Sequence, residues 1–293
     1  MLSIVYITCN RSSELEKSIR SCEACVSIDH EYVVIDNGST DNTPATIRKL
    51  IDEGLTINYC MQETNRGVSG GRNIGFNVAR GDVCYFIDDD ATIVTEGLVL
   101  DSAYQYMINH PEIFAMGTDA YDTERKTNLV GCRSKASTLE DFYPIRNYIG
   151  CSHFVRKDAV KTPYLYPDNL MYGSEELYAG LSFIYFGGTA VQYNQMKILH
   201  EPSNKTRSSM KERQRNGYIN TYVIKKYFLP FPYKVASNFL FHIRLLKFEK
   251  LSLKKVFFDM MTAKKRYDEV YKKTLDKRTI RHLIREYGLT KIL

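Results

Sequence analysis

The chain has 293 residues, of which 44% are hydrophobic and 25% charged, and its formal net charge is +6. This composition is typical of a soluble globular protein that is large enough to bury a sizeable core, and no low-complexity tract interrupts it. It contains no run of 18 apolar residues, which excludes a helix that spans a bilayer, and we expect no signal peptide at its start.

The first 90 residues alternate segments with strand and helix character. The capping rules favour Ser12 or Ser13 as the first N-cap, with Glu16 completing a capping box, and they place Pro44 in the first turn of the second helix. Strands are predicted over 3–8, 32–35, 55–60 and 83–87, and helices over 13–25, 43–53 and 70–79. This order predicts an α/β fold with a mostly parallel sheet and helices on both faces.

The predicted strands end in polar residues. Residues 8–11 read Thr-Cys-Asn-Arg, residues 36–37 read Asp-Asn, and residues 88–90 are three consecutive aspartates. Ligands bind outside the carboxyl ends of parallel strands, so these groups are expected to converge on one site. Three adjacent carboxylates repel one another, and a divalent cation is a natural counter-charge. In an extended segment Asp88 and Asp90 would point one way and Asp89 the other.

The seven cysteines carry little functional signal. Their number is odd and no secretory signal is expected, which favours reduced thiols in the cytoplasm. Cys22 and Cys25 form a C-x-x-C pair, but a zinc site would need a second pair. We therefore interpret the cysteines as packing or surface thiols.

The second half of the chain is less regular and ends in a basic region. Apolar runs occur at 113–116 and 183–186, and Val235, Phe239, Ile243 and Leu246 recur at helical spacing. Residues 1–204 carry a net charge of −10, whereas residues 205–293 carry +16. A basic helical region suits an anionic surface, either membrane lipid or nucleic acid, or it is a solvated helical subdomain.

Six segments in this order resemble family-2 glycosyltransferases, which have the GT-A fold, invert the anomeric centre and use nucleotide-sugar donors. The resemblance covers residues 1 to about 205. It rests on 7–11, 33–41, the pair 65–67 and 71–73, 88–90, 174–177, and His200. It implies a catalytic domain over 1–204, with a nucleotide-sugar half to about 110 and an acceptor half from about 111, followed by the basic helical region 205–293.

The resemblance also implies a donor site and a metal site. Asp88, Asp90 and His200 would hold Mn²⁺ or Mg²⁺. Asp36 and Asn37 would read a pyrimidine base, although Asn-Gly after them is also a strong turn signal. The donor-binding residues are expected to be Thr8, Asn10, Arg11, Asp36, Asn37, Asn65, Gly67, Arg72, Asp88 and Asp89.

The catalytic base is expected in the acidic pair. The resemblance favours Glu176 as the general base, with Glu175 as the other candidate. The pair is Glu-Glu where many members have Glu-Asp, and the usual arginine a few residues later is missing. Without the resemblance, two acids at this position would read as an exposed helix start.

The expected activity is inverting transfer from a UDP- or dTDP-sugar to a hydroxyl acceptor, such as a cell-surface polysaccharide or a lipid-linked glycan precursor. The expected location is the cytoplasm, with peripheral association at the inner membrane face through the basic region, and no nucleic-acid partner is expected. A nucleotidyltransferase is the alternative, but it would need a glycine-rich basic loop after the first strand. A nucleic-acid-binding protein would leave the acidic strand ends unexplained.

Overall fold

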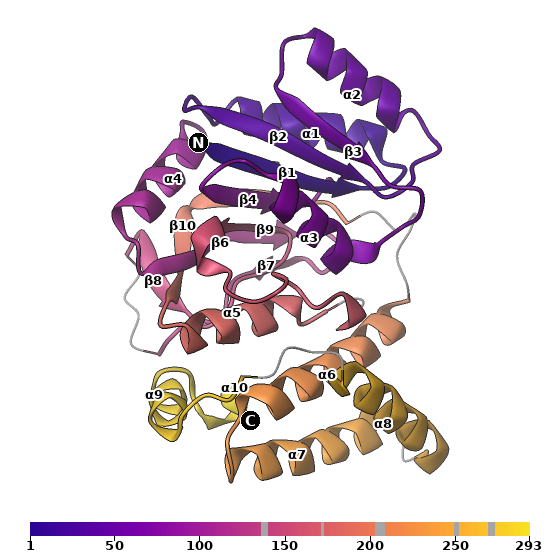
Figure 1. Ribbon diagram of the computed structural model, residues 1–293, viewed down its shortest axis with the longest axis vertical. Coiled ribbons are helices and arrows are strands. Elements are labelled where there is room, and N and C mark those ends of the chain that lie inside the picture. The colour runs from indigo at the N-terminus through magenta and orange to yellow at the C-terminus, as the bar shows by residue number, and fades with distance from the viewer. Residues whose placement is uncertain (136–139, 171–172, 203–208, 249–251, 269–272) are drawn as a thin grey trace.

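The computed structural model describes the chain except residues 136–139, 171–172, 203–208, 249–251 and 269–272 (Figure 1). The strands are β1 (Leu2–Thr8), β2 (His30–Asp36), β3 (Ile57–Met61), β4 (Val83–Ile87), β5 (Ala91–Ile93), β6 (Ile113–Asp122), β7 (Thr127–Leu129), β8 (Phe142–Ile145), β9 (Ser152–Arg156) and β10 (Thr189–His200). The α-helices are α1 (Ser12–Glu23), α2 (Thr43–Asp52), α3 (Gly67–Val78), α4 (Val99–Asn109), α5 (Glu175–Tyr185), α6 (Met210–Phe228), α7 (Tyr233–Phe248), α8 (Leu253–Asp268), α9 (Lys277–Tyr287) and α10 (Leu289–Ile292). Two 3₁₀ turns, η1 (Lys157–Ala159) and η2 (Asp168–Leu170), lie between β9 and α5.

These strands form one sheet in the order β3-β2-β1-β4-β9-β6-β10-β5. The first four strands are parallel, because a helix crosses back between each pair. The second half adds β9 antiparallel between β4 and β6, with β10 parallel to β6 and β5 antiparallel at the edge. The α/β class is confirmed, and the parallel arrangement holds for the first half of a sheet that is mixed as a whole.

Helices cover both faces of the sheet. The helices α1, α2 and α4 pack on one face, whereas α3 and α5 pack on the other (Figure 1). Glycines bring α3 close to β1, because a Cβ on Gly75 would lie 2.5 Å from Val5 Cγ1 and a Cβ on Gly71 would lie 2.8 Å from Ile7 Cγ2. The start of α3 is therefore held directly beside the carboxyl end of β1.

The helix α5 joins the sheet to the C-terminal helices. Ala179 and Phe183 belong to the core against the sheet, whereas Leu177 and Leu181 belong to a second core with α6, α8, α9 and α10. The predicted division between residues 1–204 and 205–293 stays a prediction, since its boundary lies largely outside the described residues. None of the helices in the described ranges is both long enough and apolar enough to cross a membrane.

Two local predictions can be compared with the structure. Pro44 does lie at the start of α2. The capping box of α1 is wrong, because the N-cap is Arg11 and no side chain caps the helix. Glu16 instead accepts hydrogen bonds from Arg20 and Lys49, since exposed cations on α1 and α2 offer it a stronger partner than a backbone amide.

Candidate active site

The polar strand ends meet at a cavity of about 600 Å³ beside the carboxyl edge of the parallel strands. Most residues predicted for the site line this cavity. They are Thr8, Arg11, Asn37, Asn65, Gly67, Arg72, Asp88, Asp89, Glu175, Glu176 and His200. Asn10, Asp36 and Asp90 do not line it, although Asp90 lies directly behind the wall.

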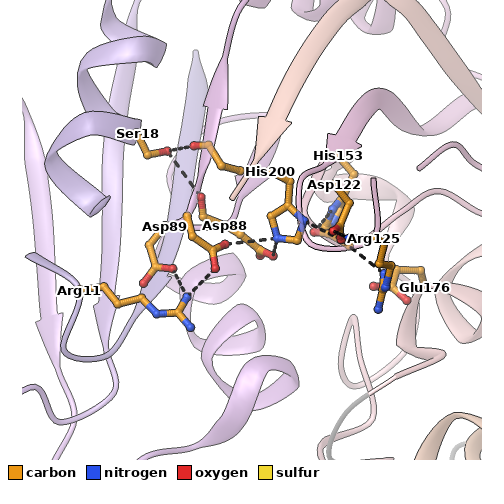
Figure 2. Close-up of polar contacts among 12 residues, drawn as sticks. Arg11, Ser18, Asp88, Asp89, Asp122, Arg125, His153, Glu176 and His200 are labelled. Carbon is orange, nitrogen blue, oxygen red and sulfur yellow. Dashed lines mark hydrogen bonds and ion pairs between the residues drawn. The ribbon is translucent and has the colours of Figure 1, made fainter. Parts of the chain in front are cut away.

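The three aspartates form a turn. The strand β4 ends at Ile87, and the amide of Ala91 donates to the carbonyl oxygen of Asp88 at 3.0 Å. Arg11 Nη1 donates to Asp89 Oδ1 at 2.6 Å and to Asp90 Oδ2 at 3.0 Å (Figure 2). The prediction that Asp89 points away from its neighbours is wrong, because strand alternation stops where the turn begins. Burial raises the pKa of Asp89 to about 7, against the opposing charge of Arg11.

Asp88, Asp90 and His200 form a cluster whose candidate ligand atoms lie within 4.8 Å of one another. His200 Nε2 is 3.3 Å from Asp90 Oδ1 and 3.9 Å from Asp88 Oδ2. Two carboxylates and one imidazole are a donor set that suits Mn²⁺, so these residues fit a divalent cation.

Asp122 was not predicted from the sequence, and it lies on the other side of His200. Its Oδ2 is 3.4 Å from His200 Nδ1, so the imidazole ring lies between Asp122 and the aspartate turn (Figure 2). Asp122 ends β6, where it is the register partner of His200 at the end of β10. An acid behind a ligating histidine fixes the orientation of its ring. The signal available in the sequence was an acid after a predicted apolar segment, as Asp88 comes after β4.

Arg72 connects the aspartates with the glutamate pair. Its Nη2 donates to Asp88 Oδ1 at 3.0 Å and to the carbonyl oxygen of Gly150 at 2.7 Å. Its Nη1 lies 3.7 Å from both Glu175 Oε1 and Glu176 Oε1. The guanidinium is buried, and Nη1 has no hydrogen-bond partner among the residues that the structure describes. Arg72 therefore offsets part of the negative charge of Asp88 and of the glutamate pair, and it keeps one donor without a hydrogen-bond partner among the described residues.

The acidic pair begins α5 and is buried. Glu175 is 3% exposed and the Glu176 side chain is 16% exposed, which contradicts the alternative of an exposed helix start. Burial raises the pKa of each carboxyl group, the charge of Glu175 raises that of Glu176 further, and Arg72 opposes these shifts. A Cβ at Gly150 would overlap Glu176 Oε1, so a larger residue at this position would displace the Glu176 carboxylate.

The turn at residues 36–37, which was predicted to contact the nucleotide base, makes mostly contacts within the protein. Asp36 is fully buried and accepts hydrogen bonds from the Ser39 amide at 2.7 Å and the Tyr59 hydroxyl at 2.6 Å. Asn10 Oδ1 accepts from the Thr40 amide at 2.7 Å. These contacts match the turn interpretation. Asn37 differs, because it both lines the cavity and donates to the carbonyl oxygen of Gly67 at 3.2 Å.

Two arginines that the sequence did not single out also line the cavity. Arg125 Nη1 is 3.6 Å from Asp122 Oδ2, and Arg213 Nη2 is 3.9 Å from Glu124 Oε2. Both come from segments without a recognisable motif, a loop after β6 and the first turns of α6. Arg125 reaches the site from the turn between β6 and β7, whereas Arg213 reaches it because α6 packs beside α5.

The chain is similar in sequence to known glycosyltransferases. Residues 3–162 match the profile of the family described as Glycosyl transferase family 2. A GalNAc(5)-diNAcBac-PP-undecaprenol beta-1,3-glucosyltransferase of Campylobacter jejuni is 33% identical over 98 residues, covering 33% of this chain and 32% of the relative. The lipopolysaccharide core biosynthesis glycosyltransferase LpsC of Rhizobium meliloti is 31% identical over 132 residues, covering 44% of each. The chain thus spans less than half the length of these two relatives.

Solved structures show the same fold. A mannosyltransferase, PcManGT of Pyrobaculum calidifontis, in complex with GDP-Man and Mn²⁺ has a TM-score of 0.61 at 14% identity, covering 90% of this chain and 73% of that one. Residues 1–349 of TarS from S. aureus, in complex with UDP-GlcNAc, have a TM-score of 0.59 at 13% identity, covering 91% and 89%. At this identity the likeness establishes the GT-A fold.

Proposed function

This chain belongs to glycosyl transferase family 2, and on that premise we propose that it transfers a sugar with inversion from a UDP- or dTDP-sugar to a hydroxyl acceptor. The acceptor would be a cell-surface polysaccharide or a lipid-linked glycan precursor. One observation carries the proposal: Asp88 and His200 of the cation cluster line the same cavity as the glutamate pair, and Arg72 contacts both Asp88 and that pair.

The donor would occupy the side of the cavity formed by β1, β2 and α3. Thr8, Asn37 and Gly67 line this side, and amide and hydroxyl groups suit a nucleoside. The structural neighbours hold GDP-Man or UDP-GlcNAc. The preference for a pyrimidine base is part of the proposal, with Asn37 rather than Asp36 as the side chain exposed to the ligand.

The cation would be held by Asp88, Asp90 and His200, with Asp122 orienting the histidine. When bound, Mn²⁺ or Mg²⁺ would offset the negative charge that develops on the leaving diphosphate. Arg11 already neutralises Asp89 and Asp90, so the protein limits the repulsion between the three carboxylates by itself.

Glu176 would act as the general base. In a direct displacement the acceptor hydroxyl loses its proton as its oxygen attacks the anomeric carbon, and a carboxylate must receive that proton. Burial and the neighbouring Glu175 raise the pKa of Glu176, which makes the carboxylate a stronger base. Glu175 is less exposed and is the second candidate.

The test is a screen of UDP-, dTDP- and GDP-sugars by thermal shift and by product formation, with Mn²⁺, with Mg²⁺ and with EDTA. We expect a UDP- or dTDP-sugar to raise the melting temperature only when metal is present. Asp90→Ala should abolish that response, while Asp52→Ala, an exposed acid on α2, should keep it. Metal-dependent release of pyrophosphate from a nucleoside triphosphate, without sugar transfer, would favour a nucleotidyltransferase instead.

The C-terminal helices support the proposal of peripheral membrane association. On α7, Val235, Phe239 and Ile243 are 58%, 66% and 41% exposed, and they recur every fourth residue on one side of the helix. On α8, the exposed apolar residues are Phe257, Phe258, Met260 and Met261. Buried positions on α7 are instead Ser237, Phe241 and Leu245. Three of the four residues of the predicted apolar stripe are therefore exposed, and the fourth, Leu246, packs against Phe241 and Leu245.

The charge around this face favours anionic lipid as its partner. Exposed lysines at 247, 254, 255, 264 and 265 flank the apolar side chains. Among the side chains of α7 and α8 that the structure describes, the acid is Asp259, which is buried and paired with Arg215. Exposed apolar groups with a basic border suit insertion at the surface of an anionic bilayer.

Vesicle sedimentation tests this association. The protein should bind phosphatidylcholine vesicles that contain phosphatidylglycerol and should not bind pure phosphatidylcholine. Phe239→Ser with Ile243→Ser should weaken binding, whereas Leu98→Ser, which changes a similarly exposed apolar residue far from these helices, should not. Equal sedimentation of both variants would argue against a membrane face on α7.

A further inference from the structure

A second cavity of about 550 Å³ lies between α6 and α7, outside the site described above. Hydroxyl groups and cations line much of it. Lining residues include Ser174, Thr221, Tyr222, Lys225, Ser237 and Arg244. We refer to this cavity as the α6–α7 groove.

Lys225 is the unusual residue of the groove. It is only 6% exposed, and its ammonium group has no hydrogen bond or ion pair with any residue in the described ranges. Arg146 and Arg244 lie close enough for their charges to act on it, and together with burial they lower the pKa of Lys225 to about 7. A buried cation without a counter-charge is costly, and further cations beside it increase the cost.

The neighbouring cations do not find carboxylates either. Arg146 donates to the carbonyl oxygen of Lys291 and to Asn147 Oδ1, and neither acceptor carries a charge. Arg244 is exposed on α7 at the opening of the groove, and it forms no ion pair with a described residue. The anionic group among the described lining residues is the terminal carboxylate of Leu293, so the three cations outnumber it and the groove keeps an excess of positive charge.

Neutral donors complete the lining. Ser174 Oγ and Thr221 Oγ1 are 2.9 Å apart, and Ser237 Oγ donates to a terminal carboxylate oxygen of Leu293 at 3.2 Å. A hydroxyl group rotates to donate to whichever acceptor is present, and phosphate oxygens accept strongly from hydroxyl and ammonium groups. A phosphate group matches both the charge and the donors of this groove.

The groove adjoins the candidate active site. Ser174 lines the groove, and the next two residues, Glu175 and Glu176, line the active-site cavity. The helix α6 lines both, with Arg213 in the active-site cavity and Lys225 in the groove. Twelve residues separate these two positions, which corresponds to about 18 Å along a helix axis.

We propose that the α6–α7 groove binds a phosphate or diphosphate group of the acceptor, held by Lys225 and Arg244 at a distance from the hydroxyl that receives the sugar. The assignment of this phosphate to the acceptor rests on the proposed function, whereas phosphate binding in the groove does not. It implies an elongated acceptor, because one end reaches Glu176 while the phosphate lies beyond the start of α5. It also gives the unbalanced lysine a function, since the ligand brings the missing negative charge.

The test compares Lys225→Met with Lys264→Met, which removes the same charge from an exposed position on α8. Inorganic pyrophosphate is titrated into each full-length variant in EDTA and followed by calorimetry and thermal shift. We expect Lys225→Met to weaken pyrophosphate binding roughly tenfold or more and Lys264→Met to leave it unchanged. Without ligand, Lys225→Met should melt at the same temperature as the original protein or higher, since it removes an uncompensated buried charge.

Two outcomes would overturn the proposal. One is equal pyrophosphate binding by both variants, and the other is a clear loss of stability in ligand-free Lys225→Met, which would indicate a structural ion pair. Vesicles with phosphatidylglycerol separate the possible sources of the phosphate, because loss of vesicle binding in Lys225→Met would assign the groove to a lipid headgroup instead.

The binding of UDP with Mn²⁺ separates this inference from the proposed function. Lys225→Met should bind UDP as the original protein does. If no variant binds UDP but pyrophosphate binding still depends on Lys225, the proposed function fails while the phosphate site stands.

Discussion

The active-site cavity and the α6–α7 groove share α6, yet they balance charge in opposite ways. In the cavity every arginine named above faces a carboxylate: Arg11 faces Asp89 and Asp90, and Arg72 faces Asp88 and the glutamate pair. In the groove, Lys225 forms no ion pair with a described residue, and the charges of Arg146 and Arg244 act on it. The cavity still has more carboxylates than arginines and gains when a cation enters, whereas the groove gains when an anion enters.

The difference also follows the distribution of charge along the chain. Residues 1–204, with a net charge of −10, supply the carboxylates of the cavity. Residues 205–293, with a net charge of +16, supply Lys225 and Arg244 of the groove and the lysines of α8. The two cavities therefore suit two ends of a reaction, a cation-assisted donor on one side and an anionic acceptor on the other.

The largest effect is expected from Glu176→Gln. The amide keeps the size and the position of the side chain but cannot accept the proton, so kcat should fall about 10²- to 10⁴-fold while donor binding stays intact. Glu175→Gln is the matched control, with a smaller loss. If Glu175→Gln shows the larger loss of kcat in a steady-state assay, the base assignment is reversed.

A direct test compares the free energy of unfolding of Arg72→Met with that of Lys225→Met. Removing Arg72 leaves three partly or fully buried carboxylates without their shared counter-charge, which should cost about 3–5 kcal/mol in the free energy of unfolding. Urea unfolding should show no loss for Lys225→Met. Similar losses in both variants would mean that the two sites do not differ as described.

Gly150→Ala should impair turnover without removing any functional group. The new methyl group would displace Glu176 or the loop, and a misplacement of about 1 Å at a reacting group costs on the order of 10²-fold in rate. The melting temperature with UDP and Mn²⁺ should stay close to that of the original protein. Full activity would imply that Glu176 does not need its position beside Gly150.

The smallest effect is expected in the dependence of kcat on pH. Because the pKa of Glu176 is raised, part of the enzyme carries a protonated and inactive base near neutral pH, and kcat should increase as the pH rises through that range. The residual activity of Glu176→Gln should lack this rise. A flat profile of kcat against pH in the original protein would contradict the raised pKa or the role of Glu176.

The sequence by itself determined the first four strands, the helices between them and the edge at which their ends meet. These features follow from local periodicity and from the rule that strands joined by crossover helices run parallel. It also determined the association of Asp88 and Asp90 with a late histidine, through the resemblance, and the contrast in charge between the two parts of the chain. These features could be predicted because each depends on a short segment of the sequence or on a sum of charges.

Only the tertiary structure decided which side chains face one another. Asp122 reaches His200 because β6 and β10 are neighbours, and Arg72 reaches the glutamate pair because α5 packs beside α3 on the same face of the sheet. The turn at residues 88–90 reversed the expected direction of Asp89, and the packing of α6 on α7 left Lys225 buried among cations. Periodicity indicates whether a residue is buried, but the partner that it contacts is set by strand order and helix packing between segments far apart in the chain.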